Sequence, residues 1–395
     1  MTRPDREDPR TLGDASAAVH AGNAFDARTG AIKTPLTLAN SYEFPYDPTS
    51  LSWEETDQLL YTRASGANQL GLQAKLARLE GGEAAIALAS GVAATHAIFF
   101  TYLNAGDHVV ASNHLYEATF NLLAEIFPAK YGITATLVDI ADLDAVAAAM
   151  RPETKLVFTE TLGNPTTSVA DLPALAAVAH AHDALLVVDS TFTPPPVLRP
   201  LEHGADLVLH SITKYINGHG DGLGGAVIGR TSLIDPLKQL AMMDVGGIIA
   251  PFNAWLITRG AVTLPLRMRH INASAQRVAE FLDADPRVAW VRYPGLASHP
   301  QRALAARLMP NGCSGMMAFA PHGDTEALNA FVSRLRLITS ATSLGHDESL
   351  IAHFARTGPR QDLYGPPFTE QGTLRLSIGL EDTDDLIADL DTALG

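Results

Sequence analysis

The stretch "DLVLHSITKYINGHGDGLGG", residues 206–225, determines how the rest of the chain is interpreted. It begins with a short apolar run that predicts a buried strand, and Lys214 follows soon after that run ends. Two hydroxyl side chains, Ser211 and Thr213, stand just before the lysine, and the segment after it is rich in glycine. Glycine lets the backbone pass close to a bound group. The stretch therefore predicts a strand that delivers an amine and two hydroxyls to a crowded site.

Similar apolar runs alternate with longer helical patterns through the middle of the chain. The runs are continuously apolar, which is typical of strands buried on both faces. Alternation of strands and helices predicts an α/β fold, with a mostly parallel central sheet and helices on both faces. The runs are AAIALAS (84–90), HVVAS (108–112), TATLVD (134–139), KLVFTE (155–160), LLVVD (185–189), DLVLHS (206–211) and GGAVIG (224–229).

The two ends of the chain differ from this middle part. Turn residues dominate residues 1–65, and their periodicity is weak, so we expect an N-terminal arm that contacts a neighbouring subunit. Residues 66–260 form the expected large domain. Residues 261–395 begin with a long amphipathic stretch and continue with short runs such as VAWVRY and LRLSIG, which predicts a smaller α+β C-terminal domain.

Composition excludes several classes of function. Of the 395 residues 47% are hydrophobic and 18% charged, as in globular proteins, and no apolar run reaches the roughly 20 residues that span a membrane. The formal net charge of −15 makes nucleic acid and anionic membranes poor partners. The polar N-terminus is unlike a secretory signal, and a single cysteine, Cys313, permits no internal disulfide. We therefore expect a cytoplasmic protein.

Polar side chains follow several of the expected strands. In an open α/β sheet, ligands bind where strands end and helices begin. Asp189 follows LLVVD, and Glu160 and Asn164 follow KLVF, while Ser90 and Gly91 open a helix whose free amides suit a phosphate. A lysine can attach an aldehyde covalently, and a carboxylate can pair with a protonated pyridine nitrogen. Phosphate, aldehyde and pyridine together describe pyridoxal 5'-phosphate (PLP).

Each of these signals also has a simpler explanation. A lysine after a strand is usually solvated, Asp189 alone suits a helix cap or turn, and the glycines could form a mobile loop. The segment GDGLGG, residues 220–225, matches the G-x-G-x-x-G dinucleotide pattern, but a lysine loop precedes it and a strand-like run follows, so we reject that interpretation. The histidines show no convincing metal spacing, and we expect no metal site. Each of these residues is a weak signal alone, and the prediction of a PLP site depends on their occurring together in this order.

These motifs resemble the PLP-dependent enzymes of cystathionine and methionine metabolism, the trans-sulfuration family. The resemblance covers about Ala21 to the C-terminus and is specific, because separate motifs agree in order and spacing. It implies the fold-type I, aspartate aminotransferase-like architecture and a homotetramer built from tight dimers. The matching segments are YTRASGANQLGLQAKLARLEGGEAAIALASGVAA (61–94), TETLGNPT (159–166), LLVVDSTFTPP (185–195), DLVLHSITKYINGHGDGLGG (206–225), YPGLASHPQ (293–301) and LRLSIGLED (374–382).

The resemblance also implies a role for each matching residue. The implied catalytic residues are Lys214, which holds the cofactor and moves protons, Asp189, which pairs with the pyridine nitrogen, and Tyr116, which stacks on the ring. The implied substrate contacts are Arg375, as a clamp for the carboxylate, with Asn164 and Ser343. Glu160 is a weaker assignment. The implied cofactor-binding set is Ser90, Gly91, Val92, Tyr116, Asn164, Asp189, Ser211, Thr213 and Lys214, together with Tyr61 and Arg63 reaching from a neighbouring subunit.

Several positions depart from the family pattern on the substrate side. Glu117 stands where the family commonly has glycine, and Ala118 stands where methionine γ-lyases carry cysteine. Thr342 replaces a glutamate found in members that use cystathionine, and Met242 and Met243 replace a Lys-Asp pair typical of methionine γ-lyases. The stretch HFARTGPRQDLYGPPF, residues 353–368, keeps the family pattern poorly. The cofactor side is therefore better defined than the substrate side.

We predict a PLP-dependent enzyme that performs γ-elimination on a sulfur-containing or related amino acid, because GHGD in the lysine loop resembles methionine γ-lyases. γ-Replacement, as in O-acetylhomoserine sulfhydrylase or cystathionine γ-synthase, is the alternative, since the same site supports both reactions. A non-catalytic binding module is a remote alternative. The expected partners are a small amino acid and other copies of the chain.

Overall fold

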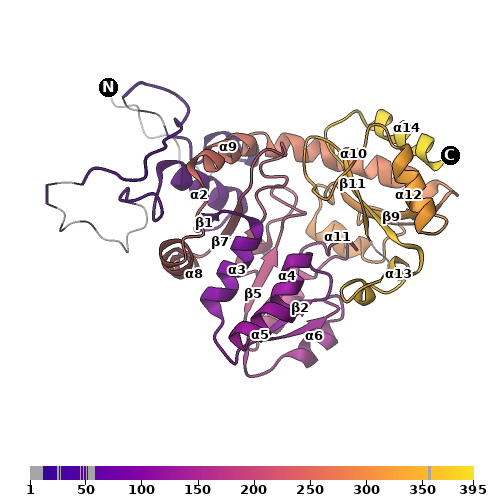
Figure 1. Cartoon of the computed structure of the whole chain (residues 1–395), viewed down its shortest axis with the longest axis horizontal. Helices are drawn as coiled ribbons and strands as arrows, with labels where there is room; N and C mark the ends of the chain where they lie inside the picture. The colour runs from indigo at the N-terminus through magenta and orange to yellow at the C-terminus, as the bar shows by residue number, and fades with distance from the viewer. Residues whose placement is uncertain are drawn as a thin grey trace.

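The computed structural model describes residues 12–24, 26, 28–44, 46–47, 49, 51, 58–354 and 357–395. Its described strands form two sheets, a larger one in the middle of the chain and a smaller one near the C-terminus. In Figure 1 the N-terminal segment extends away from the body, and a long helix runs along one side towards the C-terminal part. The fold class predicted from the sequence is confirmed.

Seven strands within the described residues form the larger sheet, in the order β1-β7-β6-β5-β4-β2-β3. Neighbours from β6 to β3 pair in parallel, whereas β7 pairs antiparallel with both β1 and β6. The sheet is thus mostly parallel, as expected. Its strands are β1 (Ala84–Leu88), β2 (His108–Ser112), β3 (Thr134–Val138), β4 (Thr154–Glu160), β5 (Leu185–Asp189), β6 (Leu207–His210) and β7 (Gly225–Gly229).

Both faces of this sheet are buried, as continuous apolar runs predict. In β5 the side chains of Leu186 and Val188 pack into one core cluster, and the intervening Val187 packs into the other. Successive side chains of a strand point to opposite faces, so two helical layers must cover the sheet. The helices of this part of the chain are α2 (Ala67–Glu80), α3 (Gly91–Tyr102), α4 (Glu117–Asn121), α5 (Phe127–Tyr131), α6 (Leu143–Ala149), α7 (Leu172–His180), α8 (Thr231–Leu237) and α9 (Pro251–Ala261), with π-helical turns at Leu122–Ile126 and Lys238–Asp244 and a 3₁₀ turn at Pro200–His203. The long α10 (Leu264–Ala284) follows and packs on the C-terminal elements β8 (Val288–Arg292), β9 (Met316–Pro321) and α14 (Thr383–Leu394).

The smaller sheet has the strand order β10-β11-β12-β9-β8 within the described residues. Only the short β10–β11 pair among these is parallel. Helices and an antiparallel sheet here agree with the α+β character expected from the sequence. The elements are β8 (Val288–Arg292), β9 (Met316–Pro321), β10 (Thr339–Ser340), β11 (Leu350–Phe354), β12 (Thr373–Ser377), α11 (Arg302–Leu308), α12 (Thr325–Arg334), α13 (Phe368–Gln371) and α14 (Thr383–Leu394), with a 3₁₀ turn at Gln361–Leu363.

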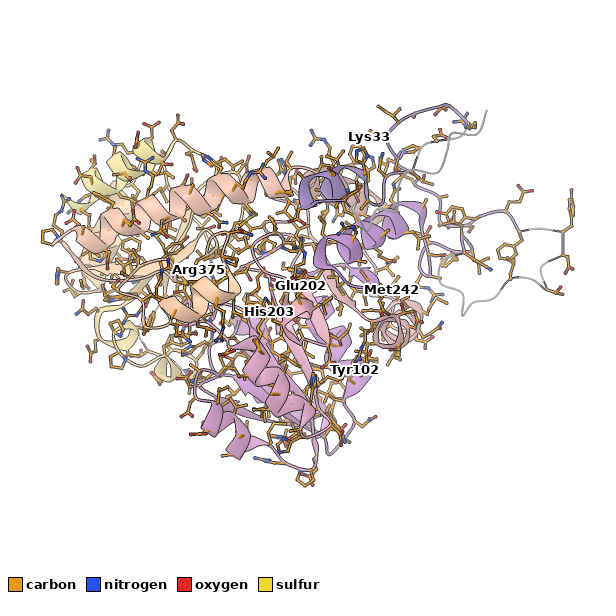
Figure 2. The ribbon with its side chains drawn as sticks, turned by 180° about the vertical axis from the view of Figure 1, so that it is seen from behind. Lys33, Tyr102, Glu202, His203, Met242 and Arg375 are labelled. Atoms are coloured by element: carbon orange, nitrogen blue, oxygen red, sulfur yellow. The ribbon has the colours of Figure 1, made fainter. Side chains whose placement is uncertain are left out.

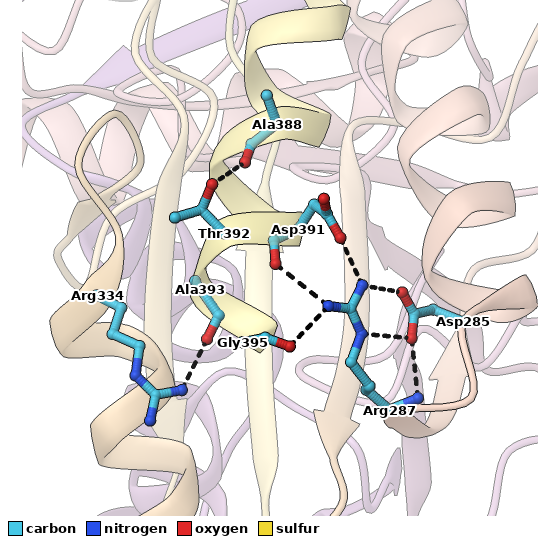
Figure 3. Close-up of polar contacts among 8 residues, drawn as sticks. All are labelled: Asp285, Arg287, Arg334, Ala388, Asp391, Thr392, Ala393 and Gly395. Carbon is cyan, nitrogen blue, oxygen red and sulfur yellow. Dashed lines mark hydrogen bonds and ion pairs between the residues drawn. The ribbon is translucent and has the colours of Figure 1, made fainter.

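Arginine side chains anchor the C-terminal helix α14 (Figure 3). Arg287 pairs with Asp285 and Asp391 at 2.5 Å each, and also donates to the carbonyl of Gly395 at 3.0 Å. Arg334 donates to the carbonyl of Ala393 at 3.0 Å. The last carbonyls of a helix have no helical partners and carry partial negative charge, so cations stabilise this end. These contacts hold the C-terminal end of α14 in place beside the smaller sheet.

The described part of the predicted arm has few regular elements. Helix α1 (Asp14–His20) packs on α2, and Trp255 Nε1 donates to the carbonyl of Thr34 at 3.2 Å. Ile32, Leu38 and other large apolar side chains of this segment are exposed. Residues 1–11, predicted to be part of the arm, lie outside the described residues. No helix in the described ranges is both long and apolar enough to cross a membrane.

Candidate active site

A cavity of about 1120 Å³ lies at the carboxyl ends of the parallel strands and extends to the smaller sheet. It is where ligands bind in open α/β sheets. The structure brings together most of the residues that the sequence predicted to form the site. The predicted residues that line the cavity are Ser90, Gly91, Val92, Tyr116, Glu160, Asn164, Asp189, Ser211, Thr213, Lys214, Ser343 and Arg375.

Lys214 lies in the turn that follows β6, and its side chain points into the cavity. Its Nζ donates a hydrogen bond to Ser343 Oγ at 2.9 Å. Burial is the main cause that lowers the pKa of Lys214 to about 8, and the positive charge of Arg375 adds to the effect. A lysine with this pKa has a substantial neutral fraction near neutral pH. Its amine can therefore act as a nucleophile or a base.

Two carboxyl groups lie side by side at the ends of β4 and β5, where Glu160 is in register with Asp189. Burial raises the pKa of Glu160 well above its ordinary value, and the neighbouring Asp189 raises it further. Glu160 also accepts a hydrogen bond from the backbone amide of Tyr116. Burial raises the pKa of Asp189 as well, but hydrogen bonds from Thr191 oppose this change. A cation placed beside Asp189 would therefore meet a carboxylate with few competing partners.

The N-terminus of α3 forms another wall of the cavity. Ser90 caps this helix, and its Oγ accepts from the amide of Ala93 at 3.1 Å. The first amides of a helix have no helical acceptors and favour an anion. Gly91 packs so closely on Ser211 that a Cβ at position 91 would lie 2.7 Å from Ser211 Cβ. Glycine is thus required for the close approach of these two segments.

Hydroxyl groups complete this wall. Ser211 donates its backbone amide to Thr191 Oγ1 at 2.8 Å, which fixes the start of the lysine turn. Thr213 lines the cavity, but its hydroxyl exchanges hydrogen bonds with the backbone of Gly224, at 3.2 Å to the carbonyl and 3.0 Å from the amide. This hydroxyl therefore holds the glycine segment in place, and it can donate to a phosphate only after it releases the carbonyl of Gly224.

Arg375 lies on β12 and enters the cavity from the smaller sheet. It is 5% exposed, and burial lowers its pKa to about 10, so it remains positively charged at neutral pH. Its Nη1 donates to Asn164 Oδ1 at 2.9 Å, and its Nη2 donates to the carbonyl of Thr342 at 3.0 Å. Phe354 packs against the guanidinium, with 5.1 Å between Cζ and the ring centroid. The group is rigidly held and is suited to an anionic ligand.

Two further carboxylates line the cavity. Glu117 is the first residue of α4, directly after Tyr116, whose ring is 49% exposed. Asp221 lies in the glycine segment after Lys214, and Asn217 Nδ2 donates to its Oδ1 at 2.9 Å. Both side chains are exposed to solvent, unlike Glu160. The cavity therefore carries two exposed carboxylates in addition to Lys214 and Arg375.

Tyr61 and Arg63 are the predicted residues that do not line the cavity of their own chain. The Arg63 guanidinium lies over the Tyr61 ring, with 5.6 Å between Cζ and the ring centroid, and it donates to the carbonyl of Met243. Met242 is buried in the core of the large sheet, and Figure 2 shows it well away from Arg375. The methionines therefore do not line the cavity of this chain, although the sequence pattern places them at a substrate-side position.

The structure adds residues that the sequence did not predict. Arg360 is 6% exposed and donates to the carbonyls of Leu115 and Asn164, each at 2.9 Å. His346 lines the cavity beside Ser343. Neither has a signal in its sequence context that separates it from surface residues. No cluster of three or more metal-ligating side chains occurs among the residues that the structure describes.

Comparison with known proteins gives a consistent result. Residues 15–395 match the model of the family described as Cys/Met metabolism PLP-dependent enzyme. The chain is 54% identical over 394 residues to canavanine gamma-lyase from Pseudomonas canavaninivorans, covering 99% of this chain and 98% of the relative. It is 40% identical over 392 residues to L-methionine gamma-lyase from Pseudomonas putida, covering 97% of each. The crystal structure of metB from Corynebacterium glutamicum superposes with a TM-score of 0.90 at 37% identity, covering 98% of this chain and 99% of that one.

Proposed function

The chain belongs to the Cys/Met metabolism PLP-dependent enzyme family, and from this premise we propose that it is a γ-lyase for an amino acid with a guanidinooxy group on its γ carbon, as in canavanine. PLP is the cofactor, an amino acid is the substrate, and the reaction is a γ-elimination. The two exposed carboxylates that line the cavity, Glu117 and Asp221, are the observation that carries the choice of substrate.

The residues of the cavity fit PLP. The close contact of Gly91 with Ser211 leaves a cradle that a Cβ would fill, and the free amides of α3 suit a phosphate. When bound, PLP supplies an aldehyde for the lysine and an electron sink for the reaction. Asp189 suits a protonated pyridine nitrogen, Tyr116 a stacked ring and Asn164 a phenolic oxygen. The proposed phosphate-binding residues are Ser90, Gly91, Val92, Ser211 and Thr213.

Side chains of the cavity supply proton transfer, substrate binding and orientation of the lysine. Lys214 Nζ removes the proton from the substrate α carbon and then assists the loss of one from the β carbon, because its lowered pKa of about 8 gives it a neutral fraction. Arg375 binds the substrate carboxylate with its planar fork. Ser343 orients the lysine through the 2.9 Å hydrogen bond to its Nζ. The bond between the γ carbon and its substituent then breaks, and the substituent leaves.

The active site is proposed to be shared between subunits. Tyr61 and Arg63 are exposed and lie outside their own cavity, and Arg63 would exchange its hydrogen bond to the carbonyl of Met243 for one to the phosphate bound by a neighbouring chain. The exposed apolar side chains near Ile32 and Leu38 would be covered by the same contact. We therefore propose a homotetramer of tight dimers. The division at residues 65 and 260, and a cytoplasmic location, likewise stay predictions.

The substrate follows from charge at the outer end of the cavity. A guanidinium forms strong, bidentate hydrogen bonds with a carboxylate. Glu117 stands where the family commonly has glycine, so this chain places a carboxylate next to Tyr116 where a leaving group would sit. Methionine, by contrast, ends in an uncharged thioether that gains nothing from Glu117. We therefore expect the cavity to bind a cationic γ substituent more strongly than a thioether.

γ-Replacement is the second candidate reaction. The same residues support it, because the outcome depends on whether a thiol reaches the site after the γ substituent leaves. A non-catalytic module does not agree with the γ-lyase relatives.

Gly91→Ala is expected to weaken PLP binding about tenfold, because forcing an extra methyl into a packed contact typically costs about 1–3 kcal/mol. The new Cβ would lie 2.7 Å from Ser211 Cβ and push apart the two segments that cradle the phosphate. PLP titration of the apoprotein, followed by absorbance, measures the change in Kd. Gly13→Ala is the control, since nothing lies within 4 Å of its added Cβ. Equal Kd values for both variants would contradict the proposal that the contact of Gly91 with Ser211 forms the phosphate site.

Glu117→Gln is expected to lower kcat/KM for canavanine about 10- to 100-fold, because hydrogen bonds to charged groups contribute about 1.5–3 kcal/mol. Release of hydroxyguanidine from canavanine and of methanethiol from methionine measures the two activities separately. Methionine turnover should change little, since its side chain is uncharged.

Two results would overturn this assignment. One is a wild-type kcat/KM for methionine that exceeds the value for canavanine. The other is an equal loss for both substrates in Glu117→Gln, which would indicate general damage to the site. Adding sulfide to the assay tests γ-replacement, because sulfide would then displace acetate from O-acetylhomoserine and form homocysteine.

A further inference from the structure

The loop between β10 and β11 packs directly on the lysine turn, and glycines make this packing possible. Gly345 has φ +68°, and a Cβ there would lie 2.6 Å from the backbone nitrogen of Tyr215. Gly220 has φ +67°, and its Cβ would lie 2.8 Å from His346 Nδ1. Such distances exclude any side chain at either position. The loop is therefore fitted to the segment that carries Lys214.

A chain of hydrogen bonds crosses this contact. Lys214 Nζ donates to Ser343 Oγ at 2.9 Å, and Ser343 Oγ lies 2.9 Å from His346 Nε2. An ammonium group can only donate, so the serine oxygen accepts from the lysine and its own proton is available to the imidazole. Nε2 of a neutral His346 then accepts, and Nδ1 carries the hydrogen. The hydrogen bonds therefore connect Lys214 Nζ with His346 Nε2, and Nδ1 lies on the opposite edge of the imidazole ring.

His346 stands between the buried lysine and the outer part of the cavity. Its Nδ1 lies beside Gly220, which is exposed, and Asp221, one of the exposed carboxylates, follows. The imidazole itself is half-buried. Lys214, in contrast, is enclosed by the cavity walls and points towards the position proposed for the cofactor. The histidine therefore supplies a short connection from the amine to solvent.

We propose that His346 is the proton outlet of Lys214, acting through Ser343. Lys214 Nζ takes a proton from the substrate α carbon and becomes an ammonium ion. It passes one proton to Ser343 Oγ while the serine hydroxyl proton moves to His346 Nε2, and Nδ1 releases a proton to water beside Gly220. One proton enters and one leaves, and no electron is transferred. His346 is thus a positioning residue for proton exchange, and the inference rests on the proposed role of Lys214 but not on canavanine.

The electrostatic surroundings suit this role. Burial lowers the pKa of His346, and the charge of Lys214 lowers it further, whereas Asp347, Glu348 and Asp221 oppose the change. The imidazole is therefore neutral at pH 7 and able to accept a proton. The pKa of Lys214, lowered to about 8, makes its ammonium form a stronger acid than a solvated lysine and so favours the transfer of a proton to Ser343 and His346.

The first test uses the apoprotein and measures coupling between the two groups. Histidine labelled with ¹³C at Cε1 allows each imidazole to be titrated by NMR, and His346→Gln assigns the resonance of His346. Lys214→Met removes a neighbouring positive charge, so the pKa of His346 should rise by about half a unit or more. The pKa of His108, which lies at the start of β2 outside the cavity and bonds Thr154 Oγ1 at 2.8 Å, should stay constant and serves as the internal control. An unchanged pKa of His346 would overturn the proposal.

The second test measures proton exchange in the holoenzyme. L-Norvaline has no leaving group, so loss of its α-proton NMR signal in D₂O reports exchange at Lys214 whatever the true substrate is. His346→Gln should slow this exchange about tenfold or more, because protons return to the substrate instead of reaching solvent. His182→Gln should exchange at the wild-type rate within about twofold, because His182 is exposed just after α7 and does not line the cavity. Equal exchange in wild type and His346→Gln, or equal slowing in both variants, would overturn the proposal.

Failure of these tests is distinct from failure of the proposed function. If canavanine is not cleaved but norvaline exchange depends on His346, only the substrate assignment fails. If canavanine is cleaved and norvaline exchange is independent of His346, only the proton outlet fails. Should His346→Gln bind no PLP, the titration of the apoprotein still decides.

Discussion

Lys214→Ala is expected to lower kcat by about 10⁴-fold, the upper end of the range that a positioned acid–base group contributes. The variant loses both the covalent attachment of PLP and the amine that moves protons. The rest of the cavity should persist, because Arg375 and the N-terminus of α3 do not depend on the lysine for their hydrogen bonds. The loss should therefore fall on kcat more than on the folded fraction.

Borohydride reduction followed by mass spectrometry provides the direct measurement. Wild-type protein should carry reduced PLP on the peptide that contains Lys214. Lys75→Met is a matched control, because burial also lowers the pKa of Lys75 to about 8, yet its Nζ donates to the carbonyl of Ala18 outside the cavity. PLP on another lysine, or a kcat for Lys214→Ala within tenfold of wild type, would contradict the assignment.

The pH dependence of PLP uptake gives an independent check on Lys214. Only the neutral amine attacks an aldehyde, and burial lowers the pKa of this lysine to about 8. The uptake rate of the apoprotein should therefore rise with pH and level off above about pH 8. A rate that keeps rising to pH 10 would indicate a solvated lysine instead.

The large sheet could be predicted from the sequence because each strand is a short, continuous apolar run between turn residues. Burial on both faces leaves no alternation in such a strand, and the runs at 185–189 and 206–211 show this clearly. Strand β11 (Leu350–Phe354) was not predicted. Its sequence, LIAHF, places a histidine within a short apolar run, so it has neither a continuous nor a strictly alternating pattern.

The cofactor side of the site could be predicted because its residues follow strands that end at one edge of the sheet. Chain order alone then places Asp189, Lys214 and Ser90 together. Arg360 and His346 come from loops that approach this edge from the smaller sheet. Their contacts with Asn164 and Ser343 depend on how the two sheets pack, and no local pattern encodes that packing.

The substrate side shows a further limit of sequence analysis. Met242 and Met243 align with a substrate-side pair, but the structure places Met242 in the core. Tyr61 and Arg63 have proposed partners on another subunit, which a single chain does not contain. The charge of the cavity is more informative than the aligned positions, since Glu117 and Asp221 are separated by about 100 residues yet line the same cavity.

Arg375→Ala is expected to lower kcat/KM by about 10²- to 10³-fold, because truncating one partner of a buried charge pair costs about 2–5 kcal/mol. The guanidinium is 5% exposed and held by Asn164 and the carbonyl of Thr342, so it reaches the substrate carboxylate already oriented. Arg375→Lys keeps the charge but loses the planar fork, and should recover only part of the loss.

The role of Arg375 as a carboxylate clamp is tested by changing the substrate as well as the enzyme. Canavanine amide lacks the carboxylate, so wild-type enzyme should use it about 10²- to 10³-fold less well than canavanine, whereas Arg375→Ala should scarcely distinguish them. Thermal unfolding of each variant separates this effect from lost stability, because Asn164 and Thr342 lose a donor when the arginine is removed. If Arg375→Ala still prefers canavanine to its amide by the wild-type factor, another group binds the carboxylate. Arg360, the other buried arginine in the cavity, would then be the residue to replace, because its Nη2 bonds the backbone carbonyl of Asn164, whose side chain bonds Arg375.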